Sequence, residues 1–391
     1  MNMKVTISDA VKYIGVDDKT IDLFESQYVV PKGVSYNSYL ILDEKVALMD
    51  TVDVRGMKEW EKNLTETLAG RKVDYLVIQH LEPDHAGSIG RLLERYPDVT
   101  LVGNAKTFAM LPQFFDIDPN VKKLTVAEGD TLSLGNHTLT FVMAPMVHWP
   151  EVMVTYESTE KILFSADGFG KFGALDSEDE EGWSCEARRY YFNIVGKYGA
   201  PVQALLKKAA NLDIQTICPL HGPVLKENLG YYIGLYDTWS SYRPEDKGVL
   251  VAYASIHGNT AKAAEKFAEM LRAKGVEKVV VSDLAREDMA EVIEDAFRYD
   301  RMVVAGASYD GGVFPCMQDF LHHLQSKAYQ NRTIGIIENG SWGPTAGRTM
   351  KAILETMKNV TIVDPMVTIK STMKESDMPA LEALADAIAN A

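Results

Sequence analysis

Six consecutive residues, His80-Leu81-Glu82-Pro83-Asp84-His85, contain four side chains that can bind a metal ion. They directly follow the apolar run 75–79, which we predict to be a buried strand. Pro83 prevents this strand from continuing and disfavours helical geometry at Glu82, so we expect a loop whose side chains converge. This density of imidazoles and carboxylates predicts a metal site at the carboxyl end of the strand.

Three further candidate ligands lie far apart in the sequence but share one kind of position. His148, Asp167 and His221 each come just after an apolar run that we predict to be a strand. Because loops gather over one edge of a sheet, we expect these side chains to join the first cluster. The seven residues supply four imidazoles and three carboxylates, which is enough for two metal ions. We expect His137 and His322–His323, by contrast, to lie on the surface.

The ligand types discriminate between metals. Three carboxylates and one bridging hydroxide neutralise two divalent ions, so such a site can be buried without a large solvation cost. Zinc sites in hydrolases favour imidazole, whereas a carboxylate-rich set with open positions suits iron or manganese. Glu82 is therefore the residue that separates the two possibilities.

The chain of 391 residues has room for two domains, and a polar segment with Pro and Gly, 241–248, reads as a linker. We therefore predict domains at residues 1–247 and 248–391. The first mixes strands with fewer helices, which predicts an α+β sheet sandwich. Its predicted strands include Tyr39–Leu42, Val46–Met49, Tyr75–Gln79, Leu139–Met143, Lys161–Phe164 and Thr216–Cys218, and Gly90–Arg95 is a predicted helix.

The second predicted domain alternates short apolar runs with helical patterns. This alternation is typical of a doubly wound parallel α/β sheet, and the order 2-1-3-4-5 places ligands beyond the ends of strands 1, 3 and 4. The predicted strands are Val249–Ala254, Val279–Val281, Met302–Ala305, Ile334–Ile337 and Met366–Ile369. The predicted helices are Asn259–Lys274, Asp288–Phe297, Pro315–Gln325, Thr345–Met357 and Met378–Ala389.

The loop after the first of these strands is Ser255-Ile256-His257-Gly258-Asn259-Thr260. Between a strand and a helix, such a loop forms a nest of backbone N–H groups suited to a phosphate, although an ordinary capped helix uses similar residues. It lacks the Gly-x-Gly-x-x-Gly spacing of dinucleotide sites. Tyr309 or Trp342, in the later loops, can stack on a flat ring. Those loops contain Ser308, Tyr309, Asp310, Gly311 and Gly312, and then Gly340, Ser341, Trp342 and Gly343.

The ligand pattern resembles that of the metallo-β-lactamase superfamily, whose fold is an αβ/βα sandwich, with Glu82 in place of the second histidine of the zinc members. In this respect the chain is similar to the flavodiiron proteins, or A-type flavoproteins. The three loops of the second half resemble the FMN site of flavodoxins, with His257 where many flavodoxins have Thr. The resemblance covers nearly the whole chain.

This resemblance implies FMN and two non-haem irons that reduce dioxygen to water, nitric oxide to nitrous oxide, or both. It assigns one iron to His80, Glu82 and His148, the other to Asp84, His85 and His221, and a bridging role to Asp167. It also implies a head-to-tail homodimer, or a dimer of such dimers, in which the FMN of one subunit lies over the diiron site of the other.

The composition of the chain limits which partners and which cellular compartment we expect. The three cysteines form no Cys-x-x-Cys pair, so we expect a separate electron donor: a rubredoxin, a flavin reductase or reduced deazaflavin. A net charge of −15 argues against nucleic acid as a partner. We find no signal peptide or apolar stretch of membrane-spanning length, and we expect a cytoplasmic protein.

An aromatic segment, 188–192, is expected to pack its rings into the core, and Tyr198 beyond it is a candidate proton donor near the metals. Trp149 is expected to form a wall of the metal site.

Two other functions fit the same residues. A zinc-dependent hydrolase of the metallo-β-lactamase type, fused to a flavodoxin module, would have the same fold, and its metal content would reveal it. An electron-transfer or binding protein would use FMN and keep a structural metal site. Substitution of Glu82 or Asp167 would then leave gas consumption unchanged.

Overall fold

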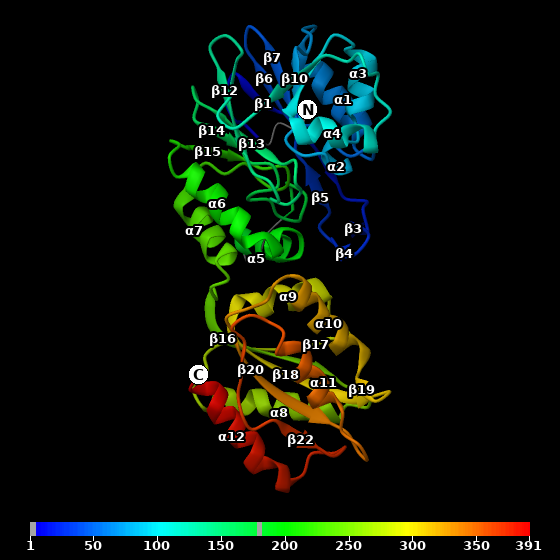
Figure 1. Cartoon of the computed structure of the whole chain (residues 1–391), viewed down its shortest axis with the longest axis vertical. Helices are drawn as coiled ribbons and strands as arrows, with labels where there is room; N and C mark the ends of the chain where they lie inside the picture. The colour runs from blue at the N-terminus through cyan, green and yellow to red at the C-terminus, as the bar shows by residue number, and fades with distance from the viewer. Residues whose placement is uncertain (1–4, 178–181) are drawn as a thin grey trace. The chain divides into compact units, whose positions relative to one another are not determined.

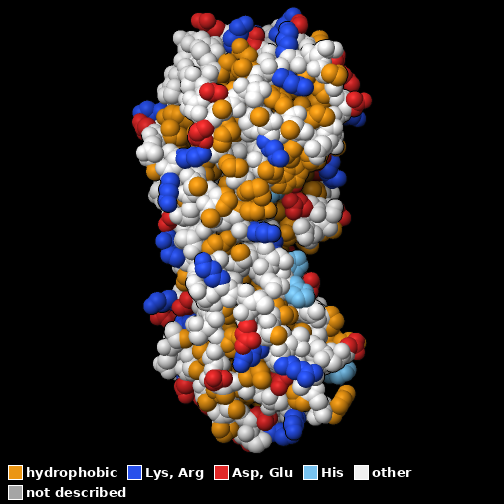
Figure 2. Space-filling model, in the orientation of Figure 1, with side chains coloured by type: hydrophobic (Ala, Val, Ile, Leu, Met, Phe, Trp, Pro, Cys, Tyr) orange, Lys and Arg blue, Asp and Glu red, His pale blue; other side chains and the backbone are white. Residues whose placement is uncertain are grey.

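The computed structural model describes residues 5–177 and 182–391, which form two compact units (Figure 1). One comprises Met1–Tyr191 and Ala200–Asp237, and the other comprises Phe192–Gly199 and Thr238–Ala391. The domain boundary between residues 247 and 248 stays a prediction. Of the helices in the described residues, none has both the length and the apolar character that crossing a bilayer requires. Figure 2 shows basic and acidic side chains intermingled over the face in view.

In the first unit, two mixed sheets share one core, as the predicted αβ/βα sandwich requires. Buried side chains from both sheets, among them Tyr39, Val77, Phe141 and Phe164, form one apolar cluster. In the described residues, the six-stranded sheet has the order β1 (Val11–Tyr13), β6 (Tyr39–Leu42), β7 (Val46–Met49), β8 (Tyr75–Val77), β9 (Thr100–Asn104) and β10 (Lys123–Val126). The five-stranded sheet has the order β11 (Thr131–Ser133), β12 (Thr138–Met143), β13 (Met153–Glu157), β14 (Ile162–Phe164) and β15 (Thr216–Cys218).

Shorter elements and helices complete this part of the chain. Two small antiparallel pairs join β2 (Val16–Asp18) to β5 (Val34–Tyr36) and β3 (Leu23–Phe24) to β4 (Tyr28–Val29). The helices are α1 (Met57–Leu68), α2 (Pro83–Ala86), α3 (Ile89–Arg95), α4 (Ala105–Phe114), α5 (Trp183–Tyr190), α6 (Gly199–Ala209) and α7 (Leu229–Ser240). The rings of segment 188–192 are buried, as expected.

The second unit is a doubly wound parallel sheet with the predicted order. Its strands are β17 (Val279–Asp283), β16 (Asp246–Ala254), β18 (Tyr299–Tyr309) and β20 (Thr333–Asn339), and β20 also pairs with β21 (Thr361–Ile362) and β22 (Val367–Ile369). The short β19 (Gly312–Val313) pairs with β18. Helices α8 (Asn259–Ala273) and α12 (Met378–Ala389) share one apolar cluster with the sheet. The other helices are α9 (Met289–Arg298), α10 (Pro315–Ser326) and α11 (Ala346–Leu354).

Two local expectations were wrong. The run after Glu82 is not a loop, because Pro83 occupies the first turn of the one-turn helix α2. The missing N–H of proline costs nothing there, so Pro83 starts this helix. Glu82 itself is not helical, with φ −56° and ψ 137°, as Pro83 was expected to ensure. His137 is not a surface residue: it is 8% exposed, and its Nδ1 lies 2.8 Å from Oδ2 of Asp43. Asp43, in the β6–β7 turn, thereby ties the two sheets together.

Candidate metal and flavin sites

The first group of candidate metal ligands comprises His80, Glu82, His148 and Asp167. Oε2 of Glu82 lies 3.2 Å from Nε2 of His80 and 3.0 Å from Nε2 of His148. Oδ2 of Asp167 lies 3.3 Å from Nε2 of His80 and 3.2 Å from Nε2 of His148. Two imidazole nitrogens and two carboxylate oxygens therefore converge on one point, which is a mixed N/O donor set.

The second group comprises Asp84, His85 and His221. Oδ2 of Asp84 lies 3.3 Å from Nε2 of His85 and 3.2 Å from Nε2 of His221. The other oxygen of Asp167, Oδ1, lies 3.2 Å from Nε2 of His85 and 3.8 Å from Nε2 of His221. One carboxylate thus presents an oxygen to each group, which is the geometry of a bridging ligand.

The strand order explains this convergence. Strands β14 and β15 are parallel neighbours, so the residues beyond their carboxyl ends, Asp167 and His221, lie at the same edge. His80 and Glu82 precede α2, whose single turn carries Asp84 and His85. All seven predicted side chains come together, although which of them bind iron stays a prediction.

Buried polar atoms test whether these residues fit a metal ion. Both oxygens of Asp84 and Asp167, both ring nitrogens of His85 and Nε2 of His221 have no hydrogen-bond partner among the described residues. An unsatisfied buried polar atom costs about 1 to 3 kcal/mol. Oδ2 of Asp84, both oxygens of Asp167 and the Nε2 atoms of His85 and His221 face one another within the two groups, so a pair of cations satisfies these atoms together. The residues therefore fit a dimetal centre.

The pKa values reflect the same crowding of charge. Burial, together with the charges of Glu82 and Asp167, raises the pKa of Asp84 to about 7. Burial lowers the pKa of His148, but the adjacent carboxylates of Asp167 and Glu82 outweigh burial and bring that pKa to about 9. In the metal-free protein, protons therefore occupy the positions that cations would take.

Several side chains around the groups escaped the sequence prediction. Glu151 accepts a hydrogen bond from Nδ1 of His80 at 2.8 Å, and its position three residues after His148 was the available signal. The ring of Tyr190 lies 5.5 Å from that of His221. Burial, then the charges of Asp167 and Asp84, raises the pKa of Tyr190.

The two aromatic residues predicted near the metals have different surroundings. The ring of Trp149 lies 5.1 Å from that of His80 and 6.1 Å from that of His148, so it forms a wall of the first group. Tyr198 lies in the short 3-10 turn Gly196–Tyr198, where Lys197 contacts its ring. Its role as a proton donor stays a prediction.

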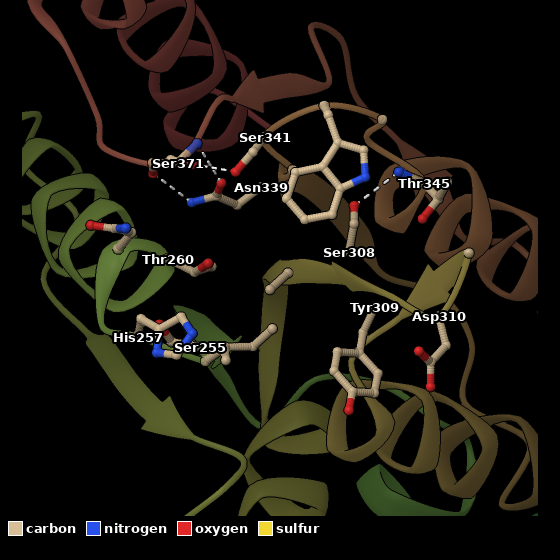
Figure 3. Close-up of a pocket in the computed structure, with 17 residues that line it drawn as sticks. Ser255, His257, Thr260, Ser308, Tyr309, Asp310, Asn339, Ser341, Thr345 and Ser371 are labelled. Atoms are coloured by element: carbon tan, nitrogen blue, oxygen red, sulfur yellow. Dashed lines mark hydrogen bonds between the residues drawn. The ribbon is translucent and has the colours of Figure 1, made fainter.

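In the second unit, a cavity of about 570 Å³ lies over the carboxyl ends of β16, β18 and β20 (Figure 3). This volume is in the range of small-molecule and cofactor sites. Of the fifteen predicted FMN residues, all but Gly258 and Gly312 line it. The lining also includes Ala307, Asn339, Thr345 and Ser371, which the sequence did not single out.

Hydrogen bonds hold the loops of this cavity in place. Oγ of Ser308 accepts from the backbone N–H groups of Thr345 at 2.8 Å and Ala346 at 3.1 Å, so it caps α11 (Figure 3). Asn339 and Ser371 exchange two hydrogen bonds, at 2.9 and 3.0 Å, which join a fourth loop to the cavity.

At the start of α8, Gly258 has a φ of +86°, a conformation that favours glycine. Gly258 has no side chain with which to cap this helix, and Oγ of Ser255 accepts from the backbone N–H of Gly258 at 3.1 Å. Asn259 and Thr260, at the first turn of the helix, line the cavity. A helix N-terminus of this kind attracts an anion.

The chain is similar to known proteins over part or nearly all of its length. A family model described as "ODP family beta lactamase" matches residues 34–222. The nitric oxide reductase of Moorella thermoacetica is 30% identical over 387 residues, which cover 97% of this chain and 96% of that protein. The anaerobic nitric oxide reductase flavorubredoxin of Vibrio vulnificus is 29% identical over 351 residues, covering 87% and 70%.

Solved structures share the fold of nearly the whole chain. The rubredoxin oxygen:oxidoreductase of Desulfovibrio gigas superposes with a TM-score of 0.91 at 26% identity, covering 99% of this chain and 98% of that chain. The flavodiiron protein of Giardia intestinalis has the same fold, with a TM-score of 0.87 at 24% identity and coverage of 98% and 95%.

Proposed function

The chain belongs to the flavodiiron protein family, and from this premise we propose how its residues carry out the family's reaction. It is an oxidoreductase that uses FMN and a non-haem diiron centre to reduce dioxygen to water, nitric oxide to nitrous oxide, or both. The observation that carries this function is Asp167, whose two oxygens face two groups of ligands at 3.2 to 3.8 Å.

We propose that His80, Glu82 and His148 hold one iron, that Asp84, His85 and His221 hold the other, and that Asp167 bridges them. The distances within each group and the unpartnered buried atoms support this assignment. Glu82 supports iron over zinc, since it replaces an imidazole by a carboxylate. Bound iron would supply electrons and open positions for a diatomic gas.

The surrounding side chains shape the pocket for a small apolar gas. Phe114 stacks on Trp149 at 5.7 Å, and Trp149 meets the ring of His80 edge-on, so aromatic rings line this side of the site. On the other side, Phe24 and Tyr190 contact the ring of His221. Tyr190 keeps its proton, because burial and nearby carboxylates raise its pKa, so its hydroxyl is available as a donor.

For the flavin, we propose that the loop 255–260 and the N-terminus of α8 bind the phosphate. The uncapped helix end supports this role, and the imidazole of His257 can donate where a hydroxyl is missing. Loops 308–312 and 340–343 would hold the isoalloxazine ring, with Tyr309 or Trp342 stacking on it.

We also propose a head-to-tail homodimer, or a dimer of such dimers, and a separate electron donor such as a rubredoxin, a flavin reductase or reduced deazaflavin. Exposed apolar side chains support a covered surface in each unit: Val29 and Val54 are 45% and 61% exposed, and Trp342 is 98% exposed. Cysteine usage supports a cytoplasmic location. Sedimentation analysis of wild type and a Val54→Asp variant tests the dimer.

Anaerobic turnover tests the function as a whole. Protein purified without oxygen is analysed for iron, zinc and FMN, then reduced and mixed with dioxygen or nitric oxide in turn. We expect two irons and one FMN per chain and consumption of at least one gas, and an Asp167→Ala variant should fall to background. Two zinc ions without iron, or no consumption of either gas, would contradict the proposal.

A further inference from the structure

Glu151 is a carboxylate outside both ligand groups that contacts one ligand from behind. It is fully buried, as is His80. Its Oε1 accepts from Nδ1 of His80 at 2.8 Å and from the backbone N–H of Leu81 at 2.9 Å. Since Nδ1 of His80 is engaged in this way, Nε2 is the nitrogen that faces Glu82 and Asp167. Glu151 therefore fixes both the tautomer and the orientation of this ring.

The position of Glu151 is itself held by the fold. The side chain of Asn104 donates from Nδ2 to the carbonyl of Glu151 at 2.7 Å. Two residues later, the N–H of Met153 donates to the carbonyl of Gln79 at 3.1 Å, which joins this segment to the residue before His80. The carboxylate is thus anchored to the same chain segment that carries its partner.

The second group has a different kind of support. Nδ1 of His221 donates to the backbone carbonyl of Ser35 at 2.7 Å, so its partner is neutral. A carboxylate partner makes an imidazole a stronger electron donor than a carbonyl does, because the N–H bond is polarised by a full charge. The two groups therefore differ electronically although both contain two histidines.

We propose that Glu151 is a positioning residue that makes the two irons inequivalent, by strengthening His80 as a ligand and favouring the ferric state of the iron held there. The inference rests on the proposed iron ligands and goes beyond them, since it predicts which iron is harder to reduce. The iron of the His80 group has the lower potential, and the iron of the His221 group is reduced first.

Two substitutions separate charge from position. In Glu151→Gln, the amide oxygen can still accept from His80 and Leu81, so geometry is retained and only the charge is lost. In Glu151→Ala, both are lost. Asp43→Asn is the matched control, because Asp43 is also a buried carboxylate paired with a histidine, His137. Asp43 lies at the amino end of β7, whereas the metal ligands lie beyond the carboxyl end of the parallel strand β8, at the opposite edge of the sheet.

The measurements are a redox titration of the iron-loaded proteins, with Mössbauer spectra of each state, and zinc affinity of the metal-free proteins by chelator competition. Loss of such a partner weakens metal binding by about 10- to 100-fold. For Glu151→Gln, a tenfold loss of affinity for ferric iron alone raises the reduction potential of the iron in the His80 group by about 59 mV. One of two iron signals should change and the other stay fixed, while Asp43→Asn keeps wild-type potentials.

The outcomes are distinct. Glu151→Gln with two irons and wild-type potentials, or with both potentials shifted equally, overturns the inference. Loss of both irons from Glu151→Gln also overturns it, whereas loss of one iron supports it. Unchanged zinc affinity in Glu151→Ala contradicts the positioning role independently of redox chemistry. If wild-type protein binds no iron, the proposed function fails instead.

Discussion

Replacing Glu82 by glutamine removes one charge from the first ligand group while keeping its shape. The carboxylate oxygen lies 3.0 to 3.2 Å from the ring nitrogens of His80 and His148, so an ion between these atoms lies within about 4 Å of the charge. At that distance and an effective dielectric constant of about 20, two unit charges attract by about 4 kcal/mol. Since about 1.4 kcal/mol corresponds to a factor of ten, we expect at least about a thousandfold loss of affinity for that iron.

Chelator competition against ferrous iron, followed by metal analysis, measures this affinity directly. Circular dichroism establishes that Glu82→Gln folds. Glu160→Gln is the control: Oε1 of Glu160 lies 3.2 Å from Nε2 of His137, and among the described residues no contact of Glu160 with a candidate metal ligand is recorded. We expect one iron to be lost at chelator concentrations that leave both in the control. Two irons retained with wild-type affinity in Glu82→Gln would refute the reasoning that this carboxylate is a ligand.

Three further results are expected. Trp342→Ala should weaken FMN binding by about threefold to tenfold, the value of one aromatic stack, and a fluorescence titration with an unchanged dissociation constant would exclude stacking by Trp342. Because His148 has a pKa of about 9 in the metal-free protein, protons compete with iron below that pH. Ferrous affinity should rise about tenfold per pH unit towards pH 9, and a flat profile would contradict this competition. Asp43→Asn should lower the free energy of unfolding by about 1 to 2 kcal/mol. Burial lowers the pKa of His137 but Asp43 and Glu160 raise it above its usual value, so this stabilisation is complete below about pH 6.5 and fades as pH rises through the raised value. Urea titrations across that pH range measure the free energy of unfolding. A wild-type value that does not change with pH would contradict the expected loss of the Asp43–His137 stabilisation.

Much of the fold and of the site could be predicted because the signals are local. Strands β6, β7 and β15 begin and end at the predicted residues, since a run of apolar residues between polar turns defines a buried strand without reference to the rest of the chain. The doubly wound parallel arrangement of the second sheet followed from alternating strands and helices. Ligand types are equally local, because side-chain chemistry does not depend on the fold.

Other expectations depended on partners that the sequence does not bring together. Asp43 lies 94 positions from His137, so the burial of that histidine could not be foreseen. Pro83 was read as a breaker, whereas its place at the start of α2 depends on where β8 ends. Tyr190 contacts His221 through the packing of α5, and nothing in the aromatic segment itself distinguishes it from its neighbours.

By itself, the sequence determined which side chains are available for chemistry: four imidazoles and three carboxylates after strands, and loops of small, hydroxyl and aromatic residues after three others. Only the tertiary structure decided how they are grouped. It sorts the seven ligands into two sets, turns one oxygen of Asp167 towards each, and places Glu151 behind a histidine 71 positions away. The physical reason is that such convergence depends on the packing of two sheets, and the register between them is set by contacts spread over the whole core.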